Sequence, residues 1–196
     1  MKKYLVGMMI CLWSYVALAQ AENLGMQDYA MRFAEVKTLQ SDFTEEKHLA
    51  LLNQPIQSEG NLVFDKQAQQ LRWQYQKPFK NGFLMQRNHI YRIQDSRKIP
   101  IQNVMGRILA AQMLVWLTLD LEALQKEYAI SFEKRAIRFT PRAKDHKLIK
   151  QITVWLDAQD PRLVTQVKME EPNGDFVLWK FRHTQLNPTL SDEVFL

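Results

Sequence analysis

The stretch GNLVFDKQAQQLRWQYQKP, residues 60–78, decides the fold of this chain. In its second half Leu71, Trp73 and Tyr75 alternate with an arginine and glutamines, so apolar and polar side chains point to opposite sides. Strict alternation of this kind is typical of a β-strand with one buried face. Pro78 ends that strand, and residues 60–65 begin the strand before it. The stretch therefore predicts two neighbouring strands of an antiparallel sheet.

The same alternation continues on both sides of this stretch. Residues 39–48 alternate upstream, and the pairs Asn81-Gly82 and Arg87-Asn88 favour turns into strands at 83–86 and 89–93. Later strands are expected at residues 130–132, 137–139, 148–156, 163–169 and 176–183. We therefore predict an α+β protein. Its strongly curved antiparallel sheet of about ten strands forms an incomplete barrel, covered by helices and enclosing a hydrophobic cavity.

Two segments have helical spacing instead. In residues 24–36 the apolar side chains recur every third or fourth position, which predicts a short amphipathic helix. Residues 103–117 are apolar nearly all round, with Arg107 and Gln112 almost the only polar members. A helix of that composition needs cover on several sides, as it would have in the mouth of a curved sheet.

The N-terminus has the pattern of a signal for export. Lys2 and Lys3 precede an uninterrupted apolar run, and Ala17-Leu18-Ala19 provides small residues for signal peptidase. We expect residues 1–19 to be a cleavable signal peptide and residues 20–196 to be a single domain. The alternative is an uncleaved membrane anchor, for which the apolar run is short. Cleavage would remove Cys11, the only cysteine, and with it any disulfide or thiolate ligand.

Charge and motifs exclude several classes of function. Losing Lys2 and Lys3 lowers the formal charge from +5 to +3, which is too weak to indicate nucleic-acid binding. The four histidines, at positions 48, 89, 146 and 183, are not spaced as metal ligands. There is no nucleophile elbow and no phosphate-binding glycine loop in the sequence. We therefore predict no catalytic residues, no metal and no cofactor, and a protein that is not an enzyme.

Aromatic and methionine residues are the candidates for ligand binding. By strand alternation many aromatic side chains should share the concave face, among them Trp155, Trp179 and Phe181. An ordinary hydrophobic core is the alternative interpretation. Methionines in and around the apolar helix favour a site that adapts to greasy ligands. The predicted cavity lining is Leu62, Phe64, Trp73, Tyr75, Phe83, Met85, Tyr91, Met105, Ile108, Leu109 and Trp116.

The order of these elements resembles the LolA-like family of periplasmic outer-membrane lipoprotein carriers. The residues that carry the resemblance are an amphipathic helix, LQSDFT at 39–44, GNLVF at 60–64, LRWQY at 71–75 with Pro78, and the apolar helix. The resemblance implies a periplasmic monomer that encloses the acyl chains of a lipoprotein or another lipid. It also implies an inner-membrane release complex as donor, an outer-membrane receptor as acceptor, and transient contact with a membrane or membrane protein.

One departure from the family leaves the cargo open. The usual Arg-Pro pair between the two strands is replaced by DKQAQQ at 65–70, and Lys66 cannot reproduce the guanidinium fork. A different acylated lipid is therefore an alternative to lipoproteins in general. Two other classes also remain: an adaptor whose concave face binds a protein segment, and an enzyme acting on a lipid. His89, which shares a strand face with Tyr91 and Ile93, is the residue that would test the enzyme.

Overall fold

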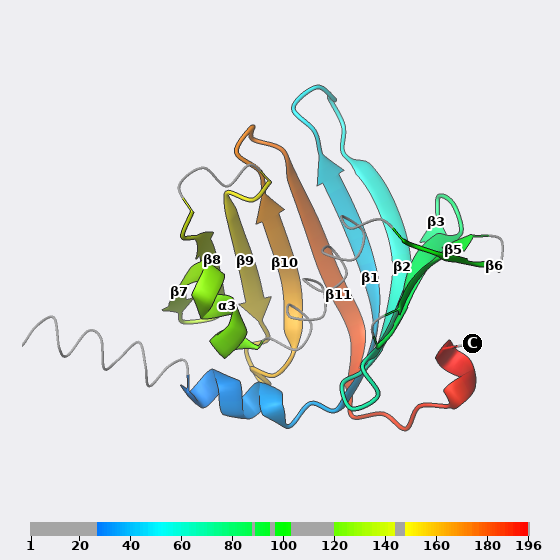
Figure 1. Ribbon diagram of the computed structural model, residues 1–196. Helices are drawn as coiled ribbons and strands as arrows, with labels where there is room; N and C mark the ends of the chain where they lie inside the picture. The colour runs from blue at the N-terminus through cyan, green and yellow to red at the C-terminus, as the bar shows by residue number, and fades with distance from the viewer. Residues whose placement is uncertain (1–26, 88, 95–96, 103–119, 144–147, 196) are drawn as a thin grey trace, which may run out of the picture.

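The computed structural model describes residues 27–87, 89–94, 97–102, 120–143 and 148–195 (Figure 1). Residues 27–34 are helical, as the spacing predicted. The other described helices are α3 (Leu121–Glu127) and the short helix η1 (Asp192–Phe195). None of the helices in these ranges is long and apolar enough to cross a membrane. The predicted apolar helix at 103–117 lies outside the described residues, and so does the predicted signal peptide.

A single antiparallel sheet of eleven strands forms the body of the described chain. Its strands are β1 (Thr38–His48), β2 (Ile56–Asp65), β3 (Gln70–Lys77), β4 (Asn81–Gln86), β5 (His89–Gln94), β6 (Arg97–Pro100), β7 (Tyr128–Glu133), β8 (Ala136–Pro141), β9 (Gln151–Leu156), β10 (Val164–Glu170) and β11 (Phe176–Leu186). The predicted curved, unclosed antiparallel sheet is confirmed. The strand that the alternation did not predict is β6, a short and fully exposed edge.

The strand order is β6-β5-β4-β3-β2-β1-β11-β10-β9-β8-β7. Each of two meanders, β1 to β6 and β7 to β11, pairs strands that follow one another in the chain. The first and last strands along the chain, β1 and β11, pair side by side and join the meanders, with Phe43 opposite Phe181 and Glu45 opposite Trp179. Residues near the two ends of the described chain therefore meet at the centre of the sheet (Figure 1).

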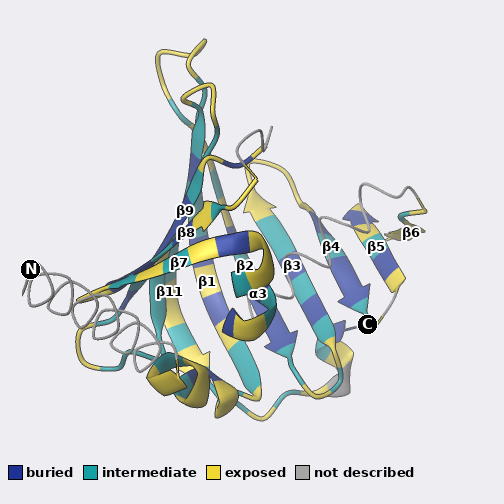
Figure 2. Ribbon diagram, turned by 60° about the vertical axis from the view of Figure 1, so that its left-hand side comes forward, coloured by how far each residue is buried: buried dark blue, intermediate teal, exposed yellow. Residues whose placement is uncertain are grey.

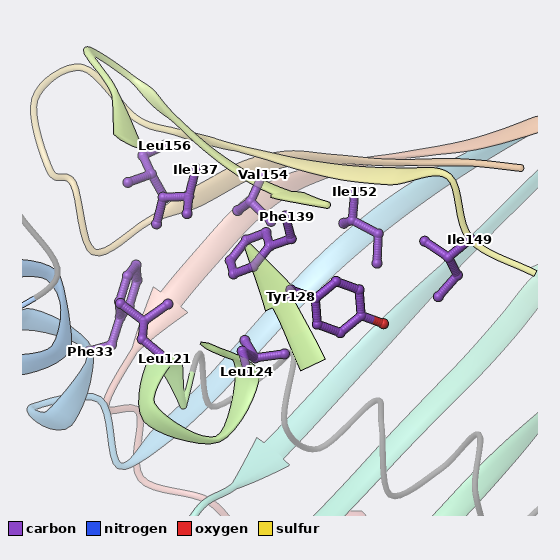
Figure 3. Close-up of a cluster of buried hydrophobic side chains, with 10 residues drawn as sticks. All are labelled: Phe33, Leu121, Leu124, Tyr128, Ile137, Phe139, Ile149, Ile152, Val154 and Leu156. Carbon is purple, nitrogen blue, oxygen red and sulfur yellow. The ribbon is translucent and has the colours of Figure 1, made fainter. Parts of the chain in front are cut away.

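The face of the sheet that carries α3 and helix 27–34 is called the inner face here, and the opposite one the outer face. On the inner face of β7 to β10, both helices pack onto a cluster of aliphatic and aromatic side chains (Figure 3). Asp120 caps α3 by accepting a hydrogen bond from the Ala123 amide at 3.0 Å. The buried members of this packed cluster are Phe33, Leu121, Leu124, Tyr128, Ile137, Phe139, Ile149, Ile152, Val154 and Leu156.

The outer face is covered at its other end by the C-terminal segment. Phe195 is buried against Val63, Leu84 and Ile93. Hydrogen bonds hold the segment in place: the guanidinium of Arg72 donates to the Val194 carbonyl at 2.8 Å, and Gln86 and Lys98 donate to the Phe195 carbonyl. Buried residues are frequent on β2, β4 and β9, whereas β10 and β11 are mostly half-buried and the tips of the β1–β2 and β3–β4 hairpins are exposed (Figure 2).

Candidate ligand-binding face

Strand register brings six of the eleven predicted lining residues onto one side of the sheet. Leu62 lies opposite Trp73, which lies opposite Phe83. In the same way Leu71 lies between two predicted residues, Phe64 and Met85. All these residues are on the inner face because each pair in register shares a side of the sheet. The six are Leu62, Phe64, Trp73, Tyr75, Phe83 and Met85.

Tyr91 is a correction to the predicted lining, because it lies on the outer face. It pairs with Leu84 and packs in the cluster around Phe195, whereas its neighbour Ile90 faces inward opposite Met85. The strand holds apolar side chains on both faces, so alternation alone cannot decide which of them points inward. His89, the residue singled out as a catalytic candidate, shares the outer face with Tyr91 and is exposed.

Trp155 was also expected on the inner face and is on the outer one. It alternates with Val154 and Leu156, which belong to the packed cluster beneath the two helices. Four further predicted lining residues lie outside the described residues and stay predictions from the sequence. They are Met105, Ile108, Leu109 and Trp116.

The inner face of β1 to β4 and β11 carries a dense group of aromatic rings, called the aromatic face from here on. The centroids of Phe43 and Trp73 are 4.3 Å apart, and Phe83 stacks on Trp73 at 6.2 Å. Trp179 and Phe181, from β11, meet Trp73 edge-on at 6.5 and 6.4 Å. Residues of the aromatic face are Leu39, Phe43, Leu62, Trp73, Tyr75, Phe83, Trp179 and Phe181.

Burial differs within the aromatic face. Phe43, Leu62 and Trp73 are buried at its base, whereas the other five side chains keep part of their surface accessible. Gly60 makes the base possible, because a Cβ at this position would come within 2.6 Å of the Phe43 ring and 2.1 Å of the Gln74 carbonyl oxygen. The sheet thus places a buried aromatic floor beneath a rim of half-exposed rings.

A carboxylate interrupts this apolar surface. The Tyr75 hydroxyl donates a hydrogen bond to Glu45 Oε2 at 2.6 Å, and the Trp179 indole N–H donates to the same oxygen at 2.7 Å. Burial, followed by the negative charge of Glu45, raises the pKa of Tyr75 well above its ordinary value. The next residue, Glu46, faces outward and binds Lys180 at 2.6 Å, which lowers the pKa of Glu46.

Sequence reasoning missed the role of Glu45. Glu45 and Glu46 are neighbours on β1 that point to opposite faces of the sheet. Strand pairing brings two aromatic hydrogen-bond donors, Tyr75 from β3 and Trp179 from β11, to Glu45. Both donors lie far from Glu45 along the chain, so the local sequence pattern could not predict them. The alternation of β1, in which Phe43 and Glu45 share a side, was the only available signal.

The described residues show no arrangement typical of a metal site. No group of three or more histidine, cysteine, aspartate or glutamate side chains in these ranges is placed to hold a metal ion. His48 stacks on Phe176 with centroids 4.1 Å apart, and His183 contacts Asp42 at 3.0 Å on the outer face. The aromatic face can therefore offer shape, apolar surface and one carboxylate to a ligand.

Comparison with protein-family models matches residues 34–196 to the family described as outer membrane lipoprotein carrier protein LolA. A comparison with curated proteins gives no match. Among solved structures, the MucA/MucB complex from Pseudomonas aeruginosa is similar over 88% of this chain and 60% of that one, with 12% identity and a TM-score of 0.53. Lipoprotein LppX from Mycobacterium tuberculosis is similar over 86% and 97%, with 9% identity and a TM-score of 0.51. At such low identity these likenesses concern the fold alone.

The family match agrees with the structure element by element. It extends from the end of helix 27–34 through all eleven described strands to the C-terminal segment on the outer face. The curved, unclosed sheet with helices on its inner face is the architecture that the resemblance implied. The chain belongs to the LolA family of outer membrane lipoprotein carrier proteins.

Proposed function

We propose that this protein is a periplasmic carrier that binds the acyl chains of lipoproteins or related lipids on its aromatic face and conveys them towards the outer membrane. The observation that carries the proposal is the difference between the two halves of the inner face. One half is packed by the protein's own helices, whereas the other presents half-exposed rings in a member of a carrier family. Binding, rather than catalysis, is what such a surface can do.

The energetics of acyl chains support a sheltering surface of this kind. Each methylene group removed from water contributes about 0.8 kcal/mol, so a fatty acyl chain gains several kcal/mol when the rings cover it. Phe83, Trp179 and Phe181 keep part of their rings accessible and provide flat apolar faces around which a flexible chain can lie. Because the rim of the aromatic face is only half-buried, a ligand there is also free to leave.

A carrier must also approach its donor and acceptor, and exposed hydrophobic side chains support transient contact with a membrane. The β1–β2 and β3–β4 hairpins lie at the same end of the sheet (Figure 1). Leu51 is 96% exposed and Phe79 is 75% exposed at their tips, with Lys47 and Lys80 nearby. Apolar tips flanked by cations suit the surface of an anionic bilayer. A release complex at the inner membrane and an outer-membrane receptor are the partners that family membership favours.

Binding of an uncharged acyl probe to the purified protein tests the proposal. Phe181→Asp places a charge on the aromatic face and should abolish binding of a fluorescent acyl ester, measured by titration. Leu178→Asp is the matched control, because Leu178 is half-buried on the same strand but faces outward opposite Glu46. Circular dichroism should show an intact sheet in both variants. Unchanged binding by Phe181→Asp would overturn the assignment of the face.

A protein segment is the second candidate ligand. The observation that favours it is the likeness of the fold to MucB, which was solved in complex with MucA. Native mass spectrometry of protein purified from its own periplasm separates the two candidates. A copurifying acylated species supports the carrier, whereas a bound polypeptide without lipid supports an adaptor.

A further inference from the structure

The charge of Glu45 has no partner of opposite sign in the described part of the chain. Its Oε2 accepts both aromatic hydrogen bonds, and its Oε1 accepts none from the described residues. Several other carboxylates of the sheet are paired with cations: Glu46 binds Lys180, and Glu170 binds Lys168 at 3.0 Å. One oxygen of the Glu45 carboxylate therefore has no hydrogen-bond donor among the described residues.

The position of this carboxylate is fixed from both sides. Tyr75 reaches it from β3 and Trp179 from β11, so two bulky rings hold one oxygen in place. The strands β2 and β1 lie between these rings, with Ser58 and Trp179 directly opposite Glu45. Lys47 follows two residues later on the same side of β1, but it is exposed and makes no ion pair with a described residue. The face thus combines an anion held by two hydrogen bonds with an exposed cation.

A ligand that covers Glu45 changes the energetics of that carboxylate. Removing an ionised group from water is costly unless a hydrogen-bond donor or a cation replaces the lost hydration. A second carboxylate placed against Glu45 would add repulsion in an environment of reduced dielectric constant. A cationic group would gain both the attraction to Glu45 and favourable contact with the faces of the surrounding tryptophan and tyrosine rings.

We propose that Glu45 selects the head group of the ligand: the aromatic face prefers amphiphiles in which the apolar chain carries an ammonium group over those that carry a carboxylate. This inference rests on the proposed function, because the chain must first bind to the rings. Glu45 lies near the end of β1 that leads to the exposed β1–β2 hairpin. The apolar chain of the ligand runs over the accessible rings of Phe83 and Phe181, and its head group lies beside Glu45.

Three probes with the same dodecyl chain test the inference below their micelle concentrations. Dodecylamine, dodecanoate and uncharged dodecyl maltoside are titrated against the protein, and binding is followed by tryptophan fluorescence. The wild-type protein should bind dodecylamine about tenfold more tightly than dodecanoate, a ratio that corresponds to about 1.4 kcal/mol. Glu45→Gln keeps the shape and an acceptor oxygen, so it should reduce that ratio to about one while dodecyl maltoside still binds.

Glu46→Gln is the matched control, because it removes the neighbouring negative charge from the outer face. It should leave the preference for dodecylamine intact. Equal affinity of the wild-type protein for the amine and the carboxylate, or an equal loss of preference in both variants, overturns the inference while binding of the maltoside still supports the carrier. Failure of all three probes to bind overturns the proposed function and the inference together.

Discussion

The two halves of the inner face use the same sheet in different ways. Beneath α3 and helix 27–34, the packed cluster consists mainly of aliphatic side chains, and its members are almost completely buried. On β1 to β4 and β11, the aromatic face consists of rings, of which several remain partly accessible, and it contains the carboxylate of Glu45. Figure 3 shows α3 and helix 27–34 against the first half.

This difference suggests separate roles for the two halves: the packed cluster stabilises the fold, and the aromatic face is the candidate site for ligand binding. Complete burial among close-packed side chains stabilises the fold, since each missing methylene leaves a cavity. Half-exposed rings contribute less to folding, because water already reaches part of their surface. We therefore expect substitutions in the packed cluster to lower the free energy of unfolding, and substitutions at the rim of the aromatic face to lower ligand affinity.

The strongest test compares one phenylalanine from each half. Phe139 is completely buried, and Phe139→Ala should lower the free energy of unfolding by about 4 kcal/mol. Phe181→Ala should lower it by about 2 kcal/mol, because the ring is only partly buried. Urea denaturation followed by circular dichroism measures both values. Equal losses would mean that the aromatic face is ordinary core.

A methyl group added at Gly60 tests the floor of the aromatic face. Gly60→Ala forces the new Cβ against Phe43 and the Gln74 carbonyl, and should cost about 2–3 kcal/mol of unfolding free energy. Gly174→Ala is the control: its Cβ would meet nothing within 4 Å, and only its positive φ of 93° opposes the change. The expected cost there is about 1 kcal/mol. A milder effect at Gly60 than at Gly174 would contradict the tight floor.

Tyr75→Phe removes one of the two donors to Glu45 and should cost about 1 kcal/mol at neutral pH. Because the pKa of Tyr75 is raised, the folded protein keeps a proton that the unfolded chain releases near the ordinary pKa of 10.0. The stabilisation by Tyr75 is therefore complete below that pH and is lost as the pH rises above it. Denaturation at alkaline pH should show a shallower decline for Tyr75→Phe than for the wild-type protein.

Trp179→Phe is the control for this pH dependence, since it removes the other donor without removing a titrating group. Its unfolding free energy should lie below that of the wild-type protein at neutral pH. A decline above pH 10 as shallow as that of Tyr75→Phe would contradict the assignment to the Tyr75 hydroxyl.

The smallest effect is expected on the surface, where the two halves do not differ. Lys77 binds Glu59 at 2.9 Å, but both side chains are more than half exposed. A double-mutant cycle of Lys77→Gln and Glu59→Gln, measured by urea denaturation, should give a coupling free energy of no more than about 0.5 kcal/mol between the two side chains. A larger coupling free energy would show that this surface ion pair stabilises β2 and β3, the strands that carry part of the aromatic face.

Local patterns were sufficient for much of this fold. The alternation around Trp73 and the turns at Asn81-Gly82 placed strands correctly, because period and turn chemistry are properties of neighbouring residues. The short helix α3 was not predicted, although Leu121 and Leu124 are spaced three apart after a capping aspartate. Its seven residues are too few to establish a period.

The candidate site was harder to predict, since it depends on register. Tyr91 was assigned to the wrong face because its strand is apolar on both sides, and only pairing with β4 decides which side chains point inward. Phe43 and Glu45 were left out of the predicted lining, because their partners on β11 lie more than a hundred residues away. Contacts between residues so far apart in the chain produce no periodic pattern in the sequence.

The pairing of β1 with β11 also has a consequence for how the protein matures. The two meanders are local in sequence and can begin to form separately, but the seam between them closes only when the last strand arrives. Asn187, just after β11, accepts a hydrogen bond from the Lys37 amide at 2.7 Å and so fastens the seam at one end. Glu45 and Trp179 face each other across that seam. A chain in which β11 has not yet paired therefore lacks the Trp179 donor that holds the Glu45 carboxylate, and the aromatic face is complete only once the last strand is in place.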